Sequence, residues 1–233
     1  MTDYRLYQEE IAPSGDYKVT QITDEEMSRA GQRWLYETLT WKAGTVHNQM
    51  DGIGDPNWCT GAAWANLIEG VTGQLVSGRK IYEDTRETFA SDEDKPGASL
   101  HESGHILLRN MHALDGPNET DLVHLRTFRS VMAWLMTRGP VVFGCRWHTG
   151  MLYPRSQRCA TWMEYAGPAM SPHAACIIGS SHKRRGFLRI ENSLGLGWGS
   201  KGLSWMPHKH FAKLFGLHRV EAMGLRLPEH KNA

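Results

Sequence analysis

The sequence has few cysteines for its length, namely Cys59, Cys145, Cys159 and Cys176 among 233 residues. No two of them form a CxxC pair, so a cysteine-rich zinc site has no support. Four scattered thiols also do not make the disulfide framework that staples small secreted domains. One of the four can be a reactive thiol, and the others are explained more simply as small buried hydrophobic residues.

Long apolar runs are missing as well. No stretch reaches the roughly 20 apolar residues that a membrane-spanning helix needs. The amino terminus, 1–5, carries an acidic residue where a secretory signal would have a basic and then an apolar run. We therefore expect a cytoplasmic protein without a membrane partner.

Neither sign of charge is in clear excess, because 26 lysine and arginine residues are matched by 25 aspartate and glutamate residues. A net charge of +1 gives no electrostatic reason to expect nucleic acid as a partner. The composition, 40% hydrophobic and 22% charged, is typical of a globular protein with a packed core. A chain of this length can form one large domain or two small lobes around a shared cleft.

Helical patterns occupy the first part of the chain and strand patterns the second. Apolar spacing and turn signals predict helices over Asp24–Leu39, Trp58–Val71, Ser77–Phe89, Ser99–Met111 and Leu122–Thr137. After the stop signal Gly139-Pro140, short strands are predicted at Val141–Cys145, Ala174–Ile178 and Phe187–Ile190. Helices followed by strands predict an α+β protein with two segregated lobes.

Cys59 lies at the predicted start of the second helix, where Asp55 or Asn57 can cap the helix and Pro56 suits its first turn. The free backbone N–H groups and the positive end of the helix dipole favour a thiolate at this place. A thiolate is the species that nucleophilic acyl transfer requires. The position alone leaves a buried structural cysteine equally open.

His173 and Asn192 could complete such a site. His173 precedes an apolar strand, where its imidazole could take the thiol proton and return it to a leaving group. Asn192 ends the next apolar strand, and its amide oxygen could accept the Nδ1–H of a histidine and fix the tautomer. Taken singly, each residue could also have no catalytic function, as a hydrogen-bonded histidine at a strand end or an asparagine in a turn.

The order of these residues resembles the papain-like cysteine peptidase family. The resemblance covers roughly residues 45 to 207 and rests on Gln49, Cys59, His173 and Asn192, followed by Gly197-Trp198-Gly199. The chain departs from the family at Leu194, where a tryptophan usually follows Asn-Ser.

The resemblance implies a two-lobed α+β fold, with a helical lobe, an antiparallel β-barrel-like lobe and the active site in the cleft between them. An N-terminal segment 1–45, a helical lobe 46–138 carrying the nucleophile, and a β-rich lobe 139–227 carrying His173 and Asn192 would together form one papain-like domain. Gln49 would supply an oxyanion-hole amide, and Trp198 would shield the His173–Asn192 contact. Pro172 and the region around Trp147 to Met151 could line the cleft. A polypeptide or other amide would be the substrate, without a cofactor.

Two alternative interpretations of the function remain. His101-Glu102-Ser103-Gly104-His105 fits the HExxH pattern of zinc peptidases, with His112, Asp115, Glu119 and His124 as possible third ligands. Alternatively, this helix packs Ile106 and Leu107 inward while its histidines face solvent. The chain could also be a papain-like scaffold that binds a protein partner or belongs to a larger assembly without turnover, since fold and function separate readily.

Overall fold

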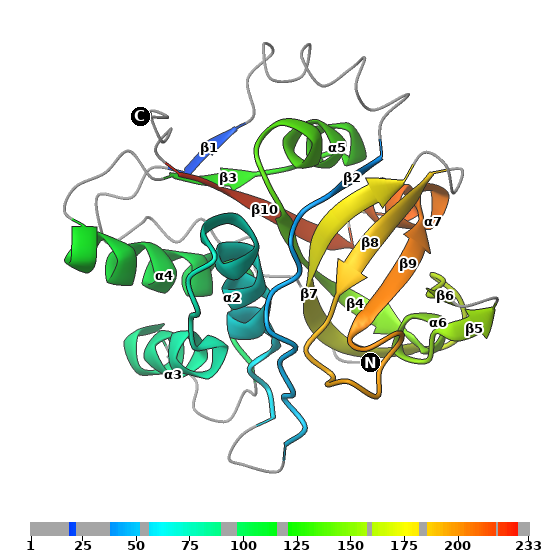
Figure 1. Cartoon of the computed structure of the whole chain (residues 1–233), viewed down its shortest axis with the longest axis horizontal. Coiled ribbons are helices and arrows are strands. Elements are labelled where there is room, and N and C mark those ends of the chain that lie inside the picture. Colours follow the sequence, from blue (N-terminus) through cyan, green and yellow to red (C-terminus); the bar gives the residue numbers. More distant parts are fainter. Residues whose placement is uncertain are drawn as a thin grey trace.

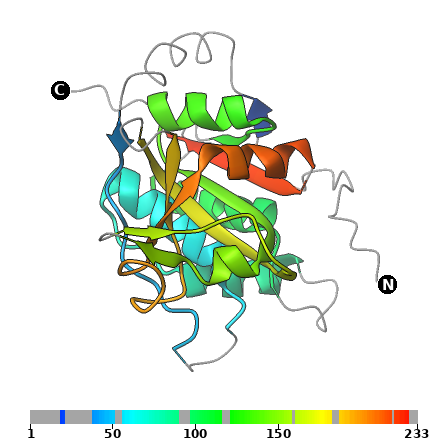
Figure 2. The same ribbon diagram turned by 90° about the vertical axis from the view of Figure 1, so that its right-hand side faces the viewer.

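The structure is a computed structural model (Figures 1 and 2). It describes residues 19–21, 38–51, 56–89, 97–115, 121–157, 160–181, 186–217 and 219–227. The helices are α2 (Cys59–Thr72), α3 (Gly78–Phe89), α4 (Leu100–Asp115), α5 (Phe128–Thr137), α6 (Thr149–Leu152) and α7 (His208–Gly216). The strands are β1 (Val19–Gln21), β2 (Leu39–Thr40), β3 (Asp121–His124), β4 (Val141–His148), β5 (Arg155–Gln157), β6 (Ala160–Trp162), β7 (Ala169–Ser181), β8 (Phe187–Glu191), β9 (Leu203–Pro207) and β10 (Val220–Arg226).

The described strands form one sheet in the order β1-β3-β10-β4-β7-β8-β9-β6-β5, and β2 pairs with β7 beside this path. Neighbours are antiparallel except for the pairs β1–β3 and β6–β9. Figure 1 shows α2, α3 and α4 gathered on one side of the molecule and β7, β8 and β9 on the other. The fold is therefore α+β, as the sequence predicted.

Two hydrophobic cores lie on opposite faces of β4 and β7. In β7, Ala175 and Ile177 belong to the core that is closed by α5 and α7, whereas Ala174, Cys176 and Ile178 belong to the core that is closed by α2 and α4. Both faces of these strands are covered, which explains why their sequences read as continuous apolar runs. Figure 2 shows α5 and α7 lying side by side over the sheet.

The helices α2 and α3 cross at two glycines. A Cβ atom on Gly61 would lie 2.0 Å from the carbonyl oxygen of Gly78, so no larger residue fits at this crossing. Close packing here holds α2, the helix that begins with Cys59, in a fixed position beside the sheet.

Several predicted elements differ in the structure. Leu122–Thr137 is not one helix, because the first residues form β3, paired with β10, and α5 begins only at Phe128 with Thr127 as its N-cap. Tertiary pairing has overridden the local helical pattern there. The predicted helix Asp24–Leu39 lies largely outside the described residues, and Leu39 itself is in β2.

The C-terminal part contains elements that the sequence analysis did not predict. Helix α7 follows β9 directly, and β10 inserts between β3 and β4 in the sheet. The 138/139 division between the expected lobes stays a prediction, but α5, which precedes it, packs onto the sheet. Among the described residues, no helix is long and apolar enough to cross a membrane.

Candidate active site

Cys59 is the first residue of α2 and is partly exposed. The residue before it, Trp58, occupies the N-cap position without a side-chain hydrogen bond to the helix. The predicted caps are therefore wrong where the structure describes them, since Asn57 does not cap the helix; Asp55 lies outside the described residues. The first amides of α2 thus receive no side-chain cap from Trp58, and the Thr60 amide hydrogen-bonds to the Cys59 thiol.

His173 lies within β7, at the point where the strand turns from exposed to buried. Residues 169–172 are exposed and those from Ala174 onward are buried. The imidazole hydrogen-bonds to the Cys59 thiol on one side and to Asn192 on the other. Strand β7 thus brings an imidazole from the sheet against the first residue of α2.

Asn192 follows β8 and is completely buried. Its Oδ1 atom lies 2.7 Å from Nε2 of His173 and also accepts the Ser193 amide hydrogen at 2.8 Å. The sequence analysis expected Nδ1 of the histidine to make this contact, which is wrong. Because Nε2 bonds to Asn192, Nδ1 is the ring nitrogen left for the thiol of Cys59.

The charges of Cys59 and His173 support each other. Burial raises the pKa of Cys59, but the positive charge and hydrogen bond of His173, with backbone hydrogen bonds from Ala174 and Thr60, outweigh it, so that the pKa falls below its usual value. Burial lowers the pKa of His173, but the Cys59 charge and the hydrogen bonds to Cys59 and Asn192 raise it above its usual value. The geometry therefore favours a thiolate–imidazolium pair.

The other described cysteines have a different environment. Cys145 and Cys176 are fully enclosed in the cores, and burial raises the pKa of both thiols far above the usual value. Cys159 lies outside the described residues. Of the three described thiols, only Cys59 is partly exposed and has a lowered pKa.

Gln49 adjoins Asn192 through Ser193. The backbone N–H of Gln49 donates to the Ser193 carbonyl oxygen at 2.8 Å. The Ser193 hydroxyl donates to the side-chain Oε1 of Gln49 at 2.5 Å. Because Oε1 is the accepting atom, the Nε2 amide is the donor end of this side chain. The sequence analysis missed Ser193, which follows Asn192 directly and connects the two predicted residues.

Trp198 is buried, and its indole N–H donates to the Leu152 carbonyl oxygen at 3.0 Å. The ring that contacts His173 belongs to Trp147, whose centroid lies 4.4 Å from the imidazole in an edge-on arrangement. Trp198 packs behind it, 6.0 Å from the Trp147 ring. Trp147 was predicted only to lie near the cleft. On β4 it lies two residues after Cys145, the register partner of His173 on β7, and this placement could not be read from spacing.

At Leu194 the chain lacks the tryptophan that the resemblance leads us to expect after Asn192-Ser193. Leu194 packs at the edge of the core that contains Trp147. The large ring next to His173 is that of Trp147 on β4. Pro172, predicted to contact substrate, is exposed on β7 beside His173, and its role stays a prediction.

The HESGH segment forms the first turns of α4. Nε2 of His101 lies 3.0 Å from Nε2 of His105, and the ring of His124 is 5.4 Å from that of His101. Among the described residues, no group of three His, Cys, Asp or Glu side chains could hold a metal ion. Ile106 and Leu107 pack inward as expected, but His105 does not simply face solvent, since only 8% of it is exposed.

Comparisons with known proteins concern the fold. No protein-family model and no curated protein sequence matches the chain. Xylellain, a cysteine protease from Xylella fastidiosa, superimposes with a TM-score of 0.63 over 91% of this chain and 92% of its own, at 15% identity. The chain has the papain-like fold. Bromelain from Ananas comosus in complex with E64 matches with a TM-score of 0.57 at 15% identity, over 83% of this chain and 100% of its own. CMS1MS2, a cysteine protease of Carica candamarcensis in complex with E-64, matches with a TM-score of 0.55 at 16% identity, over 82% of this chain and 99% of its own.

Proposed function

We propose that this chain is a thiol hydrolase of the papain-like type that cleaves peptide or related amide bonds. In this proposal Cys59 is the nucleophile, His173 the general base and acid, and Asn192 the residue that orients the imidazole. Gln49 supplies one oxyanion-hole amide, and Trp147, with Trp198 packed behind it, shields the His173–Asn192 contact. The substrate is a polypeptide, and no cofactor takes part.

One observation carries the proposal, namely the position of His173, which hydrogen-bonds to Asn192 on one side and interacts with the Cys59 thiol on the other. A thiol held at a helix start is activated when a nearby imidazole can take its proton. A buried amide oxygen 2.7 Å from the far ring nitrogen keeps that imidazole in one orientation and tautomer. These are the geometric requirements of nucleophilic acyl transfer.

The first half of the reaction is acylation. The Cys59 thiolate attacks the substrate carbonyl carbon, and the carbonyl electrons move to oxygen. The Cys59 backbone amide and the Gln49 side-chain amide hydrogen-bond to that oxygen. The carbon–nitrogen bond then breaks while the imidazolium of His173 gives its proton to the departing amine. The products are a thioester on Cys59, a free amine and a neutral imidazole.

The second half releases the acyl group. Neutral His173 takes a proton from water, and the resulting hydroxide attacks the thioester carbon. Collapse of this intermediate breaks the carbon–sulfur bond, frees a carboxylic acid and restores the thiolate–imidazolium pair. Asn192 accepts from the imidazole throughout, so the ring keeps its position in both halves.

The experiment is selective labelling of the folded chain. Iodoacetamide and the epoxide E-64, the inhibitor named for bromelain and CMS1MS2, should label Cys59 far faster than Cys145 or Cys176, as measured by peptide mass spectrometry. The two buried thiols are internal controls, because their pKa values are shifted upward. Equal and slow labelling of all three would overturn the proposal.

Turnover separates an enzyme from a scaffold. A fluorogenic peptide library should be cleaved by the wild-type chain and not by Cys59→Ala, while circular dichroism shows the same fold for both. Rapid labelling of Cys59 without any cleavage would instead indicate a scaffold that binds a protein partner. Cleavage that survives Cys59→Ala but stops with chelator would point to the HESGH segment.

A further inference from the structure

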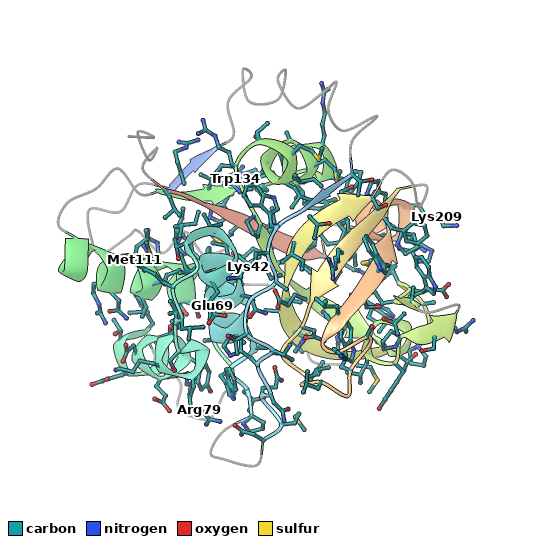
Figure 3. The ribbon with its side chains drawn as sticks, viewed as in Figure 1. Lys42, Glu69, Arg79, Met111, Trp134 and Lys209 are labelled. Carbon is teal, nitrogen blue, oxygen red and sulfur yellow. The ribbon has the colours of Figure 1, made fainter. Side chains whose placement is uncertain are left out.

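Two buried glutamates, one from the helices and one from the sheet, meet beside the candidate site. Glu69 lies on α2 and is 5% exposed, and Glu191 ends β8, immediately before Asn192, and is fully buried. Figure 3 shows Glu69 on α2, between the helices and the sheet. Neither carboxyl group has a role in the proposed reaction, and fully buried glutamates are rare unless they are paired.

The two carboxyl groups hold consecutive backbone amides of one segment. Oε2 of Glu191 accepts the N–H of Gly44 at 3.1 Å, and Oε2 of Glu69 accepts the N–H of Thr45 at 2.5 Å. Oε1 of Glu69 also accepts the N–H of Val76 at 3.3 Å. A Cβ atom on Gly44 would lie 2.9 Å from Oε2 of Glu69, so the backbone approaches as closely as glycine allows.

The segment they hold leads to Gln49. Four residues after Thr45, the Gln49 amide bonds to Ser193, so residues 44 to 49 lie between the carboxyl pair and the Asn192–Ser193 corner. Gly195 also donates to the His47 carbonyl oxygen at 3.1 Å. A displacement at Gly44 and Thr45 would therefore be transmitted to the predicted oxyanion-hole residue.

No strong base balances the pair. Within the described segments, neither glutamate forms an ion pair with a lysine or arginine, and the nearest base is His47, whose Nε2 lies 3.9 Å from Oε1 of Glu69. Burial lowers the pKa of His47, although the Glu69 charge opposes this shift, so His47 tends to be neutral. Two carboxylates in such surroundings would repel each other, which is why closely spaced acids share a proton.

Two buried acceptors at this place lack a donor. Among the described residues, Oε1 of Glu191 and Oδ1 of Asn66 have no hydrogen-bond partner. Asn66 lies against Gly44, as does Glu69. An ionised carboxylate with one buried oxygen that accepts no hydrogen bond is costly, and a proton on Glu191 removes that cost. Burial and the Glu69 charge raise the pKa of Glu191 to about 7, and the Gly44 and Arg189 interactions only partly offset them.

We propose that Glu191 works as a neutral carboxylic acid beside Glu69, and that this pair positions residues 44–49 and with them Gln49. Both are positioning residues for the proposed hydrolase, on which this inference rests. Loss of the Glu191 proton puts two negative charges in one buried place, pushes Gly44 and Thr45 apart from their acceptors and displaces Gln49.

Other charged groups around Glu191 do not cancel this effect. Its partner on β7 is Cys176, a thiol whose pKa is raised mainly by burial. Arg189 on β8 lowers the pKa of Glu191 but is stacked over the Trp205 ring. The other charged or titratable groups near Glu191 are Glu69 on α2 and His47 in the segment 44–49.

The test compares Glu191→Gln with Glu191→Ala in the full-length chain. Glutamine keeps a neutral acceptor for the Gly44 amide, whereas alanine removes it. We expect kcat/KM of the wild type to fall as pH rises through about 7 more steeply than that of Glu191→Gln. Glu191→Ala should lower kcat by about tenfold or more at pH values where the wild type is fully active, with little change in KM, because a displaced donor weakens the transition state.

Unfolding in urea gives a second readout that needs no activity. Because the folded-state pKa of Glu191 is raised, stability is lost as pH rises through that pKa. The urea midpoint of the wild type should drop between pH 6 and pH 8 relative to that of Glu191→Gln. If the chain has no hydrolase activity, this comparison still tests the carboxyl pair, so the two proposals fail separately.

Glu221→Gln is the matched control. Glu221 on β10 is another carboxyl group whose pKa is raised to about 7, by burial and by Glu102, and its register partner is Gly144 on β4, not a residue of 44–49. Its replacement should leave the pH profile of kcat/KM unchanged. Profiles and urea midpoints of wild type and Glu191→Gln that coincide above pH 7 would overturn the proposal, as would equal changes from Glu191→Gln and Glu221→Gln in the activity profile.

Discussion

Removing the side-chain amide of Asn192 isolates the contribution of the residue that orients His173. In Asn192→Ala, the 2.7 Å hydrogen bond from Nε2 of His173 disappears. A hydrogen bond to a charged group is worth about 1.5–3 kcal/mol, and about 1.4 kcal/mol corresponds to a factor of ten in rate. We therefore expect kcat/KM to fall by about 10- to 150-fold.

The pH profile gives the direction of the effect. The hydrogen bond to Asn192 is one of the interactions that raise the pKa of His173. Its loss should move the alkaline limb of the kcat/KM profile to lower pH, since the imidazolium then loses its proton more easily. Asn192→Asp keeps an acceptor and adds a negative charge, so it should move the same limb to higher pH.

The assay is cleavage of a fluorogenic peptide from pH 5 to pH 9 by the three proteins, with urea unfolding to confirm that each variant is folded at the assay temperature. Opposite shifts in the two variants would support the assigned role. A rate within twofold of the wild type for Asn192→Ala, or alkaline limbs that move in the same direction in both variants, would refute the reasoning.

Two further predictions concern the surroundings of the site and the HESGH helix. Trp147→Ala, which removes a buried ring 4.4 Å from the imidazole, should lower the free energy of unfolding by about 3–5 kcal/mol. It should also lower kcat/KM as water reaches His173, and Trp147→Phe should retain most of both; a kcat/KM unchanged in the folded alanine variant would contradict the shielding role. Burial and neighbouring charges lower the pKa of His105 and of His124 to about 4. Because the unfolded chain then binds more protons than the folded one, stability should fall as pH drops from about 6.5 toward 4, and urea midpoints that stay constant over this range would contradict it.

Local sequence patterns predicted the helices near the nucleophile well. The pattern around residues 58–71 identified α2 because its apolar positions repeat at helical spacing and a turn-rich segment precedes it. The α+β class followed from helices preceding strands, and the papain-like fold followed from the order of a few site residues. These features depend on neighbouring residues or on order along the chain, which a single sequence contains.

Interactions between distant segments were decided by the tertiary structure. Strand β3 was predicted as part of a helix, because its local pattern fits a helix and only its pairing with β10 makes it a strand. The same limit hid Trp147, since its contact with His173 depends on the register of β4 against β7. The nitrogen of His173 that faces Asn192 also depends on side-chain geometry that no spacing rule contains.

By itself the sequence determined the residue types, the helix that begins with Cys59 and the chain order of thiol, imidazole and amide. Tertiary structure alone decided that these groups meet, which ring lies against His173, and that Glu69 and Glu191 hold one segment between them. The physical reason is that helix formation is governed by residues a few positions apart, whereas the pKa values and hydrogen bonds of a site are set by atoms that folding brings together.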